Sequence, residues 1–413
     1  MKMAKVFSNI ITAIDIGTTK ICVLIARKLS DDQVEVLGVG RSPSYGLSKG
    51  VVVDIAKTVS SIKQAVDEAQ LMAECEVEST YIGISGAHIK SFNSSGAVPI
   101  KRSAVTQEDI DTALAAAKAV PIEKGQKVLH VLPQYFMVDG QDRIENPIGL
   151  HGVRLEVVVH VITGSVASIQ NLVKCCETIG LKVQDIVLEQ LASADGVLSL
   201  DERQLGVGVL DIGGGTSDFA IYQNGTIRFT KVVAIAGNHF TNDLAVGLRA
   251  NITDAERIKH ESGYVGFDDE RLQGEGVEVV TAEGNETRIV EKEHVSYILQ
   301  ARAQELFMMI NHELQDSHLR RLMVTGLVIT GGGSLLKGID EIAKNILSVP
   351  VRIGMPKSGQ IIPDSLQNPI YATGYGLLIF ALKSNKNNSM NSMQGPLVKK
   401  IFVRMKLWVS DFF

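Results

Sequence analysis

The stretch Val209-Leu210-Asp211-Ile212-Gly213-Gly214-Gly215-Thr216 has the pattern of a short apolar strand that ends in an aspartate and a glycine-rich turn. The same pattern occurs near the N-terminus, where Ala13-Ile14-Asp15-Ile16-Gly17 matches Val209-Leu210-Asp211-Ile212-Gly213 at a separation of 196 residues. A returning strand is predicted after each turn, at 21–26 and at 219–222. The sequence therefore predicts one internal duplication of a strand–turn–strand unit, and not a solenoid with a short repeat.

These turns have a composition that suits phosphate binding. A glycine-rich turn lets backbone N–H groups approach phosphate oxygens with no Cβ in the way. A carboxylate one residue before the turn can hold hydrated Mg²⁺ against those phosphates. Two converging carboxylates repel each other unless a cation lies between them, so Asp15 and Asp211 together predict a Mg²⁺ bound through water. One such hairpin is usually an ordinary tight turn, but the matched pair and a third turn, Thr330-Gly331-Gly332-Gly333, favour nucleotide binding.

The composition is that of an ordinary globular protein. Of the 413 residues, 45% are apolar and 21% are charged, and this length predicts two or more domains. The 41 Lys and Arg against 46 Asp and Glu give a net charge of -5, which excludes the strongly basic footprint of a dedicated nucleic-acid binder. The four cysteines are too few and too unevenly spaced for a disulfide framework or a zinc site, and they fit a reducing cytosol.

Other common signatures are missing from the sequence. No stretch reaches the ~18 uncharged apolar residues that a spanning helix needs, and the apolar run at 10–14 is too short for a signal-peptide core. We therefore expect a protein made and kept in the cytoplasm. No Gly-x-x-x-x-Gly-Lys-Ser/Thr loop occurs, which excludes a P-loop enzyme. Gly83-Ile84-Ser85-Gly86-Ala87 lacks the final glycine of a nucleophile elbow, so we interpret it as a strand edge that enters the next unit.

The hydrophobic pattern predicts the elements between these motifs. Residues 85–163 are predicted to form a separate unit, which contains a helix with Thr106 as its N-cap. The polar, charge-rich stretch at 254–293 is predicted to be an inserted lobe and the partner surface. The other predicted elements are a strand at 34–40, a helix with Ile55, Val59, Ile62 and Val66 on one face, a helix at 295–314, a strand at 326–330 and a helix from Leu335.

The three motifs, in this order, resemble the actin, heat-shock-chaperone and sugar-kinase superfamily of ATP-binding proteins, and within it the FtsA family of bacterial cell-division proteins. Gly46-Leu47-Ser48-Lys49-Gly50-Val51, His130-Val131-Leu132-Pro133-Gln134 and Asn146-Pro147-Ile148-Gly149-Leu150 also carry the resemblance. It implies an α/β, actin-like duplicated ATPase fold with two lobes around a nucleotide cleft. The implied boundaries are lobe I at 1–84 and 164–195, an FtsA-type inserted subdomain at 85–163, and lobe II at 196–383 with a polar sublobe at about 235–305.

The resemblance also implies roles for individual residues around bound ATP. The implied phosphate contacts are Gly17, Thr18, Thr19 and Lys20 from one hairpin, and Gly213, Gly214, Gly215 and Thr216 from the other. Asp15 and Asp211 are implied to bind Mg²⁺ through water. Gly331, Gly332 and Gly333 are implied to lie along the adenosine, and Glu256 and Lys259 to contact the ribose, although these two also suit a solvated helix face.

Hydrolysis of ATP is a separate question. Glu189 is the candidate catalytic residue, because it stands where related ATPases keep an acidic residue to orient water. However, Gln190 replaces the proline that is usual in those ATPases, and Asp218 stands where actin uses a histidine. A general base must lie within hydrogen-bond reach of its water. The sequence thus predicts ATP binding, with weak hydrolysis at most.

The last residues have the pattern of an amphipathic helix. On a wheel at ~100° per residue, the apolar arc of 397–413 includes Leu397, Ile401, Phe402, Met405, Trp408 and Phe412, and Lys399, Lys400, Arg404 and Lys406 lie outside it. Such an arc can pack in the core, pair with another helix or lie on a membrane surface. The polar stretch at 384–396, predicted to be a flexible linker, argues against the core. Basic residues near an anionic leaflet contribute ~1 kcal/mol each, which favours in-plane anchoring to anionic lipids.

The leading interpretation is therefore an ATP-binding cytoskeletal protein of cell division. The resemblance implies that it polymerises on the inner face of the cytoplasmic membrane at the septum, as a peripheral protein, and tethers the FtsZ ring there. It also implies that later division proteins are recruited, with no role for nucleic acid. The alternatives are a small-molecule kinase or ATPase of the same superfamily, which has no use for a membrane helix, and a pilus-assembly actin-like adaptor, against which the basic tail argues.

Overall fold

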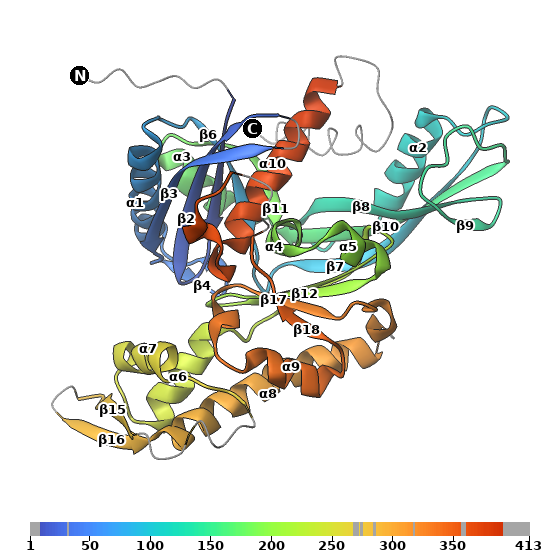
Figure 1. Ribbon diagram of the computed structural model, residues 1–413. Helices are drawn as coiled ribbons and strands as arrows, with labels where there is room; N and C mark the ends of the chain where they lie inside the picture. The colour runs from blue at the N-terminus through green and yellow to red at the C-terminus, as the bar shows by residue number, and fades with distance from the viewer. Residues whose placement is uncertain are drawn as a thin grey trace.

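The computed structural model describes residues 9–30, 33–266, 272, 276–283, 286–316, 319–356 and 361–390. Two five-stranded sheets lie one above the other, and a smaller unit extends from the side of the molecule (Figure 1). We name the first sheet and its helices lobe I, the second sheet and its helices lobe II, and the smaller unit the inserted subdomain.

The two large sheets have the same strand order. Lobe I runs β11-β6-β1-β2-β3, and lobe II runs β18-β17-β12-β13-β14 when read in the matching direction. In each lobe the first two strands are an antiparallel hairpin and the next neighbour is parallel. The predicted duplication is confirmed, and it extends beyond the hairpin to the whole sheet. The strands are β1 (Ile10–Ile16), β2 (Lys20–Lys28), β3 (Val34–Pro43), β6 (Ser79–Ile84), β11 (Lys182–Leu188), β12 (Val207–Ile212), β13 (Ser217–Gln223), β14 (Thr226–Val233), β17 (Leu327–Thr330) and β18 (Val351–Ile353).

Lobe I is a three-layer unit, because helices cover both faces of its sheet. Side chains that alternate along β1 and β2 enter two different cores, with Ile14 and Val23 on one face and Ala13 and Leu24 on the other. Burial on both faces explains why these strands are continuous apolar runs. The helices are α1 (Ile55–Ala73) and α3 (Val166–Thr178) on the first face, and α4 (Glu189–Val197) and α10 (Ala372–Met390) on the second, with the short strands β4 (Leu47–Ser48) and β5 (Val51–Val52) and the helix α5 (Leu200–Leu205) at the edges.

In lobe II, the sheet packs against helices, and part of the predicted polar stretch belongs to one of them. The 254–293 segment forms most of α7 and the hairpin of β15 and β16, which project at the lower left of Figure 1. Its other helices are α6 (Gly237–Gly247), α7 (Ile252–Glu261), α8 (Lys292–Asp316) and α9 (Ile339–Leu347), and its hairpin is β15 (Gly276–Val280) with β16 (Thr287–Glu291). The predicted helix start at Leu335 is wrong. Residues Gly332–Leu335 form a 3-10 turn, and α9 begins after Gly338, whose φ of 83° interrupts the helical path.

The inserted subdomain is an antiparallel sheet, β7-β10-β8-β9, covered by α2. Helix α2 begins with a capping box between Thr106 and Asp109, as its N-cap predicted. Two buried histidines join the subdomain to both lobes: His130 Nε2 accepts the Leu188 N–H at 3.1 Å, and His160 Nε2 lies 2.9 Å from Thr230 Oγ1. Burial lowers the pKa of both rings to about 4, so both are neutral at pH 7. The elements are β7 (Lys90–Pro99), α2 (Gln107–Lys118), β8 (Gln126–Val138), β9 (Gln141–Ile144) and β10 (Arg154–Ser165).

Helix α10 differs from the prediction at its C-terminal end. A flexible linker was expected from Ser384, with the ordered body ending near Leu382, but α10 continues to Met390. Its first half is anchored in the lobe I core by Tyr375, Leu377 and Leu378. Once a helix is nucleated, each added residue gains one hydrogen bond, and no glycine or proline interrupts the chain between Gly376 and Gly395. The remaining predicted linker, 391–396, and the predicted membrane helix, 397–413, lie outside the described residues.

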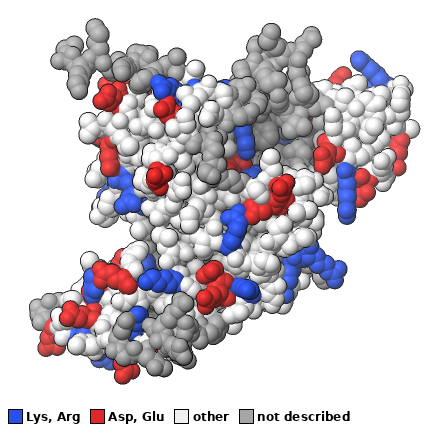
Figure 2. Space-filling view, in the orientation of Figure 1, with Lys and Arg blue, Asp and Glu red and all other residues white. Residues whose placement is uncertain are grey.

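Acidic and basic side chains both occur on the face shown in Figure 2, separated by broad uncharged areas. Neither sign forms a large patch on this face, in keeping with the net charge of -5. Within the described residues, no helix is both long enough and apolar enough to cross a bilayer.

Close packing of α10 on α4 gives a stability prediction. A Cβ at Gly376 would lie 1.7 Å from the Ala192 carbonyl oxygen, a backbone atom that cannot move without shifting α4. Overpacking of this kind costs ~1–3 kcal/mol or more, which exceeds the ~1 kcal/mol that alanine gains in helix propensity. We expect Gly376→Ala to lower the melting temperature by several degrees, as measured by circular dichroism.

The matched control lies in the same helix. At Gly374 the nearest atom to an added Cβ is Leu24 Cδ1 at 3.5 Å, an ordinary contact. Gly374→Ala should therefore keep or slightly raise the melting temperature. Equal melting temperatures for the two variants would contradict the packing argument.

Candidate functional site

A cavity of about 750 Å³ lies between the two lobes. This volume is within the ~300–1,000 Å³ range of small-molecule sites. Residues from both hairpins, the third glycine turn, α4 and α7 line it. All the residues predicted for phosphate, metal, adenosine, ribose and water contacts are among them: Asp15, Gly17, Thr18, Thr19, Lys20, Glu189, Asp211, Gly213, Gly214, Gly215, Thr216, Glu256, Lys259, Gly331, Gly332 and Gly333.

The two hairpin turns have the same geometry. The Gly17 N–H donates to the Lys20 carbonyl at 3.1 Å, and the Gly213 N–H donates to the Thr216 carbonyl at 3.0 Å. Each turn therefore places its aspartate, Asp15 or Asp211, at the same position in front of it. The duplicated sequence folds locally in the same way because glycine has no Cβ to crowd the carbonyl oxygen across the turn. An added Cβ would lie 2.9 Å from that oxygen at Gly17 and 3.1 Å from it at Gly213.

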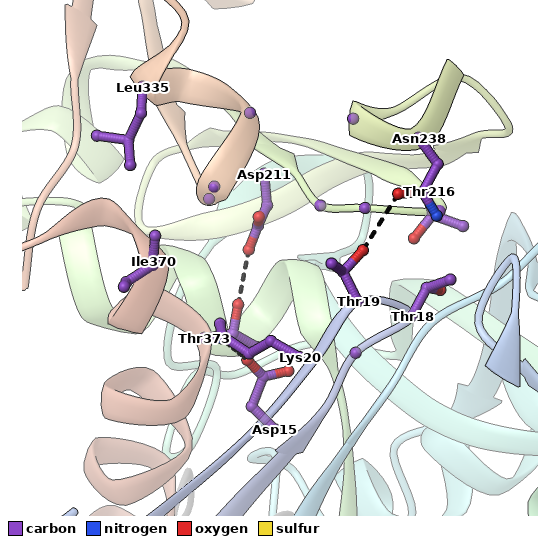
Figure 3. A pocket seen from close by; sticks show the side chains of 18 of the residues that line it. Asp15, Thr18, Thr19, Lys20, Asp211, Thr216, Asn238, Leu335, Ile370 and Thr373 are labelled. Carbon is purple, nitrogen blue, oxygen red and sulfur yellow. Dashed lines mark hydrogen bonds and ion pairs between the residues drawn. The ribbon is translucent and has the colours of Figure 1, made fainter. Parts of the chain in front are cut away.

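The tips of the two turns approach each other across the cavity. A Cβ at Gly214 would lie 1.8 Å from Thr19 Oγ1, and one at Gly215 would lie 2.4 Å from Thr18 Oγ1, so only glycine permits this approach. The Thr19 hydroxyl donates to Asn238 Oδ1 at 3.3 Å (Figure 3). Within the described chain, the N–H groups at 18, 19, 214 and 215 donate to no backbone carbonyl. Unpaired N–H groups in two facing turns are the donors that a phosphate chain requires.

The two predicted metal carboxylates have different partners. Lys20 Nζ lies 2.8 Å from Asp15 Oδ2 (Figure 3). Burial alone would lower the pKa of Lys20, but the Asp15 charge raises it above its ordinary value. Asp211 Oδ2 instead accepts hydrogen bonds from two hydroxyls, Thr373 at 2.7 Å and Ser193. Burial raises the pKa of Asp211, although these hydroxyls oppose the shift.

The donors present suit a hydrated magnesium ion. Carboxylate oxygens are the hard ligands that Mg²⁺ prefers, usually one or two from the protein with water and phosphate completing the shell. Among the described residues no group of three or more His, Cys, Asp or Glu side chains converges to hold a metal directly. Asp15 and Asp211 thus fit a cation that takes its remaining ligands from water and from a bound phosphate chain.

Glu189 and Asp218 lie at the floor of the cavity as a second acidic pair. Glu189 packs over Gly83, where an added Cβ would lie 3.2 Å from Glu189 Cγ. Burial and the nearby Asp218 raise the pKa of Glu189. Burial also raises the pKa of Asp218 to about 7, against hydrogen bonds from Ser85 at 2.5 Å and Thr216 at 3.1 Å. A carboxyl group with a pKa near the working pH can accept a proton from water.

The third glycine turn packs tightly against β12, and all three of its glycines line the cavity. A Cβ at Gly331 would lie 2.1 Å from Asp211 Oδ1, and one at Gly333 would lie 2.3 Å from Ile212 Cγ2. Packing against β12 therefore already requires glycine at these two positions. A Cβ at Gly332 would meet only Ile370 Cγ2, at 3.9 Å, so packing does not require glycine at this position. Leu335 and Ile370 lie beside it and form an apolar wall (Figure 3).

The predicted ribose residues form a partly buried ion pair on α7. Lys259 Nζ lies 2.7 Å from Glu256 Oε2 and donates to Thr241 Oγ1 at 2.9 Å. The Lys259 side chain is only 12% exposed, so the alternative of a solvated helix face is wrong for it. Burial raises the pKa of Glu256, but the Lys259 and Thr241 hydrogen bonds outweigh it and lower the pKa overall.

Several residues of the cavity were missed by the sequence analysis, which interpreted Ser85 only as a strand edge. The missed residues that line the cavity or bond to its carboxylates include Ser85, Ser193, Asn238, Leu335, Ile370 and Thr373. One signal could have found Ser85. In the paired registers, Ile14 lies beside Ile82 in lobe I and Leu210 beside Ile329 in lobe II. Extending the duplication to these third strands aligns Ser85 with Gly332 of the glycine turn.

The duplicated sheets, the facing aspartate turns and the cavity between the lobes define the actin-like class of proteins. Solved structures agree at the level of the fold. A chain of a PilM-PilN type IV pilus biogenesis complex matches with a TM-score of 0.66 at 16% identity, over 90% of this chain and 98% of that one. MreB 5 of Spiroplasma citri bound to AMPPNP matches with a TM-score of 0.59 at 15% identity, over 94% and 99%.

Sequence relatives are much more similar. The cell division protein FtsA of Pseudomonas aeruginosa is 42% identical over 420 residues, covering 100% of both chains. That of Escherichia coli K12 is 36% identical over 97% of this chain and 96% of its own length. The family model for the cell division protein FtsA matches residues 208–376, and the model for the SHS2 domain inserted in FtsA matches residues 86–163. The chain belongs to the FtsA family of cell division proteins.

Proposed function

We propose that the chain binds ATP in the cavity between the lobes and that bound ATP holds the lobes in a closed state that polymerises. The observation that carries this proposal is the pair of facing turns, whose N–H groups at 18, 19, 214 and 215 have no other backbone acceptor in the described chain. A phosphate chain between them would contact both lobes at once. Since a ligand that contacts both lobes favours the state in which they are close, ATP would shift the population toward closure.

The chain's own residues have distinct parts in this proposal. Lys20 and the turn amides bind phosphate, and the apolar wall near Gly332 takes the base. Mg²⁺ next to Asp15 and Asp211 would supply charge neutralisation for the phosphates. Glu189 would orient water, with its proton affinity raised by burial and by Asp218. Because burial and the nearby Asp218 favour the protonated form of Glu189, which cannot take a proton from water, we propose that turnover is slow and that the nucleotide acts mainly as a conformational ligand.

We further propose that the protein works at the division site as a peripheral protein on the inner face of the cytoplasmic membrane. Family membership supports a role among division proteins. The proposed partners are FtsZ, later division proteins, anionic lipids and further copies of this chain. Lipid contact is assigned to the amphipathic pattern at 397–413, and the α7 and β15–β16 region is the proposed partner surface.

Electron microscopy on anionic lipid monolayers tests the proposal directly. We expect full-length protein with ATP and Mg²⁺ to form filaments on the monolayer, because closure and membrane attachment act together. Protein lacking 397–413 should leave the monolayer bare under the same conditions. Filaments that form equally well without nucleotide would contradict the proposed role of ATP.

A further inference from the structure

We propose that Ser193 and Thr373 are positioning residues that orient the Asp211 carboxylate and thereby set the Mg²⁺ requirement of nucleotide binding. The inference rests on the proposed function, since it concerns the same cavity. Neither residue has a role in the sequence motifs of the hairpins. Both hydroxyls contact the Asp211 carboxylate.

The first argument is the geometry of the three groups. Thr373 Oγ1 donates to Asp211 Oδ2 at 2.7 Å, and Ser193 Oγ donates to the same oxygen (Figure 3 shows the Thr373 contact). The two hydroxyls lie 3.0 Å from each other. Ser193 is fully buried, and Thr373 is 7% exposed. Two buried donors on one carboxylate oxygen restrict the orientation of the carboxyl group more than a single hydrogen bond would.

The second argument is the state of the other carboxylate oxygen. Asp211 Oδ1 makes no hydrogen bond with any residue that the structure describes. Space beside it is kept by Gly331, where any Cβ would lie 2.1 Å from Oδ1. Since Asp211 lines the cavity, the hydroxyls hold one oxygen and leave the other available to a metal-bound water.

The third argument is a difference between the duplicated halves. Asp15, the counterpart of Asp211, is neutralised by the Lys20 ammonium at 2.8 Å. Hydroxyl donors stabilise a carboxylate without cancelling its charge. Asp211 has no Lys or Arg ion pair of this kind among the described residues, so it is the carboxylate of the pair with more attraction left for a cation. Partners of this kind typically change metal affinity 10–100-fold when removed.

The fourth argument is the origin of the groups. Asp211 belongs to the lobe II strand β12, whereas α10, which carries Thr373, is anchored in the lobe I core through Tyr375 and Leu377. Ala372, next to Thr373, and Ala194, next to Ser193, pack in a core cluster with the lobe II strands, so both hydroxyls lie where the two lobes meet.

The alternative is a purely structural role, in which the hydroxyls only satisfy a buried charge. Thr373→Val has nearly the same shape but no hydroxyl, and Thr373→Ser keeps the hydroxyl. The experiment measures binding of a fluorescent ATP analogue to the full-length variants while Mg²⁺ is titrated, together with the melting temperature. We expect Thr373→Val to raise the Mg²⁺ concentration for half-maximal binding about 10–100-fold, and Thr373→Ser to remain within about threefold of the unmodified protein.

The outcomes separate the possibilities. Ser193→Ala should shift the Mg²⁺ midpoint in the same direction as Thr373→Val. A lower melting temperature for Thr373→Val with an unchanged Mg²⁺ midpoint would show a structural role and overturn the inference. Weaker analogue binding at saturating Mg²⁺ with no midpoint shift would overturn it as well. If the unmodified protein fails to bind the analogue at any Mg²⁺ concentration, the proposed function itself fails, which is a different result.

Discussion

Asp211→Ala is expected to abolish measurable binding of Mg²⁺-ATP, with a loss of at least about 100-fold in affinity. Three effects add in this variant. The cavity loses the carboxylate that fits a hydrated cation, and it loses the negative charge that draws one in. In addition, the Ser193 and Thr373 hydroxyls lose their acceptor, and a buried unsatisfied donor costs ~1–3 kcal/mol. Isothermal titration calorimetry with ATP and Mg²⁺ measures the loss.

A matched variant separates charge from structure. Asp211→Asn keeps an oxygen that can accept both hydroxyls and removes only the charge, so it should fold with a melting temperature close to that of the unmodified protein. We expect it to bind ATP nearly as poorly as Asp211→Ala in the presence of Mg²⁺. Undiminished ATP binding by both variants would remove the basis for placing the cation beside this residue.

The duplicated hairpins could be predicted from sequence because their signal is local. An apolar strand, an aspartate and a glycine turn are contiguous at Asp15 and again at Asp211, and the backbone geometry of each turn depends on those few residues alone. The order of the five strands in each lobe then follows from building the same unit twice. Local physics and the repeated pattern were enough for the duplicated hairpins and their turns, whereas the two-lobed fold and the roles of most cavity residues came from the family resemblance.

The hydroxyl groups of the cavity could not be predicted in the same way. Ser193 lies in the middle of α4, and Thr373 begins α10, 162 residues after its partner in the chain. A serine or threonine in a helix has many possible partners, including its own backbone. Which partner it takes depends on how α4 and α10 pack between the lobes. That packing requires glycines such as Gly376, and no sequence motif marks them as packing residues.

The error at the predicted linker has a related cause. Asparagine and serine residues after Leu382 have poor helix propensity, but the cost is at most ~0.7 kcal/mol per residue. The buried first half of α10 supplies the costly nucleus, so the helix continues to Met390 despite its composition. Helix propensity describes each residue by itself, whereas the position of the helix end depends on the buried helical residues that precede it.

Removal of residues 397–413 is expected to release the protein from anionic liposomes while nucleotide binding stays unchanged. The described cavity contains no residue beyond Thr373, so calorimetry with ATP should give the same affinity for the truncated and full-length proteins. Sedimentation with vesicles that contain anionic lipid should show most of the full-length protein in the pellet and the truncated protein in the supernatant. Equal pelleting of the two proteins would exclude the segment as the anchor.

Two further variants divide the binding energy of the segment between charge and apolar contact. Replacing Lys399, Lys400, Arg404 and Lys406 with serine removes an attraction of ~1 kcal/mol per basic residue near an anionic surface. That variant should bind the vesicles much more weakly, and its residual binding should no longer depend on the salt concentration. Trp408→Ser with Phe412→Ser instead removes apolar burial and should weaken binding at every salt concentration. If only the charge variant releases, the segment binds lipid electrostatically and does not enter the interface as an amphipathic helix would.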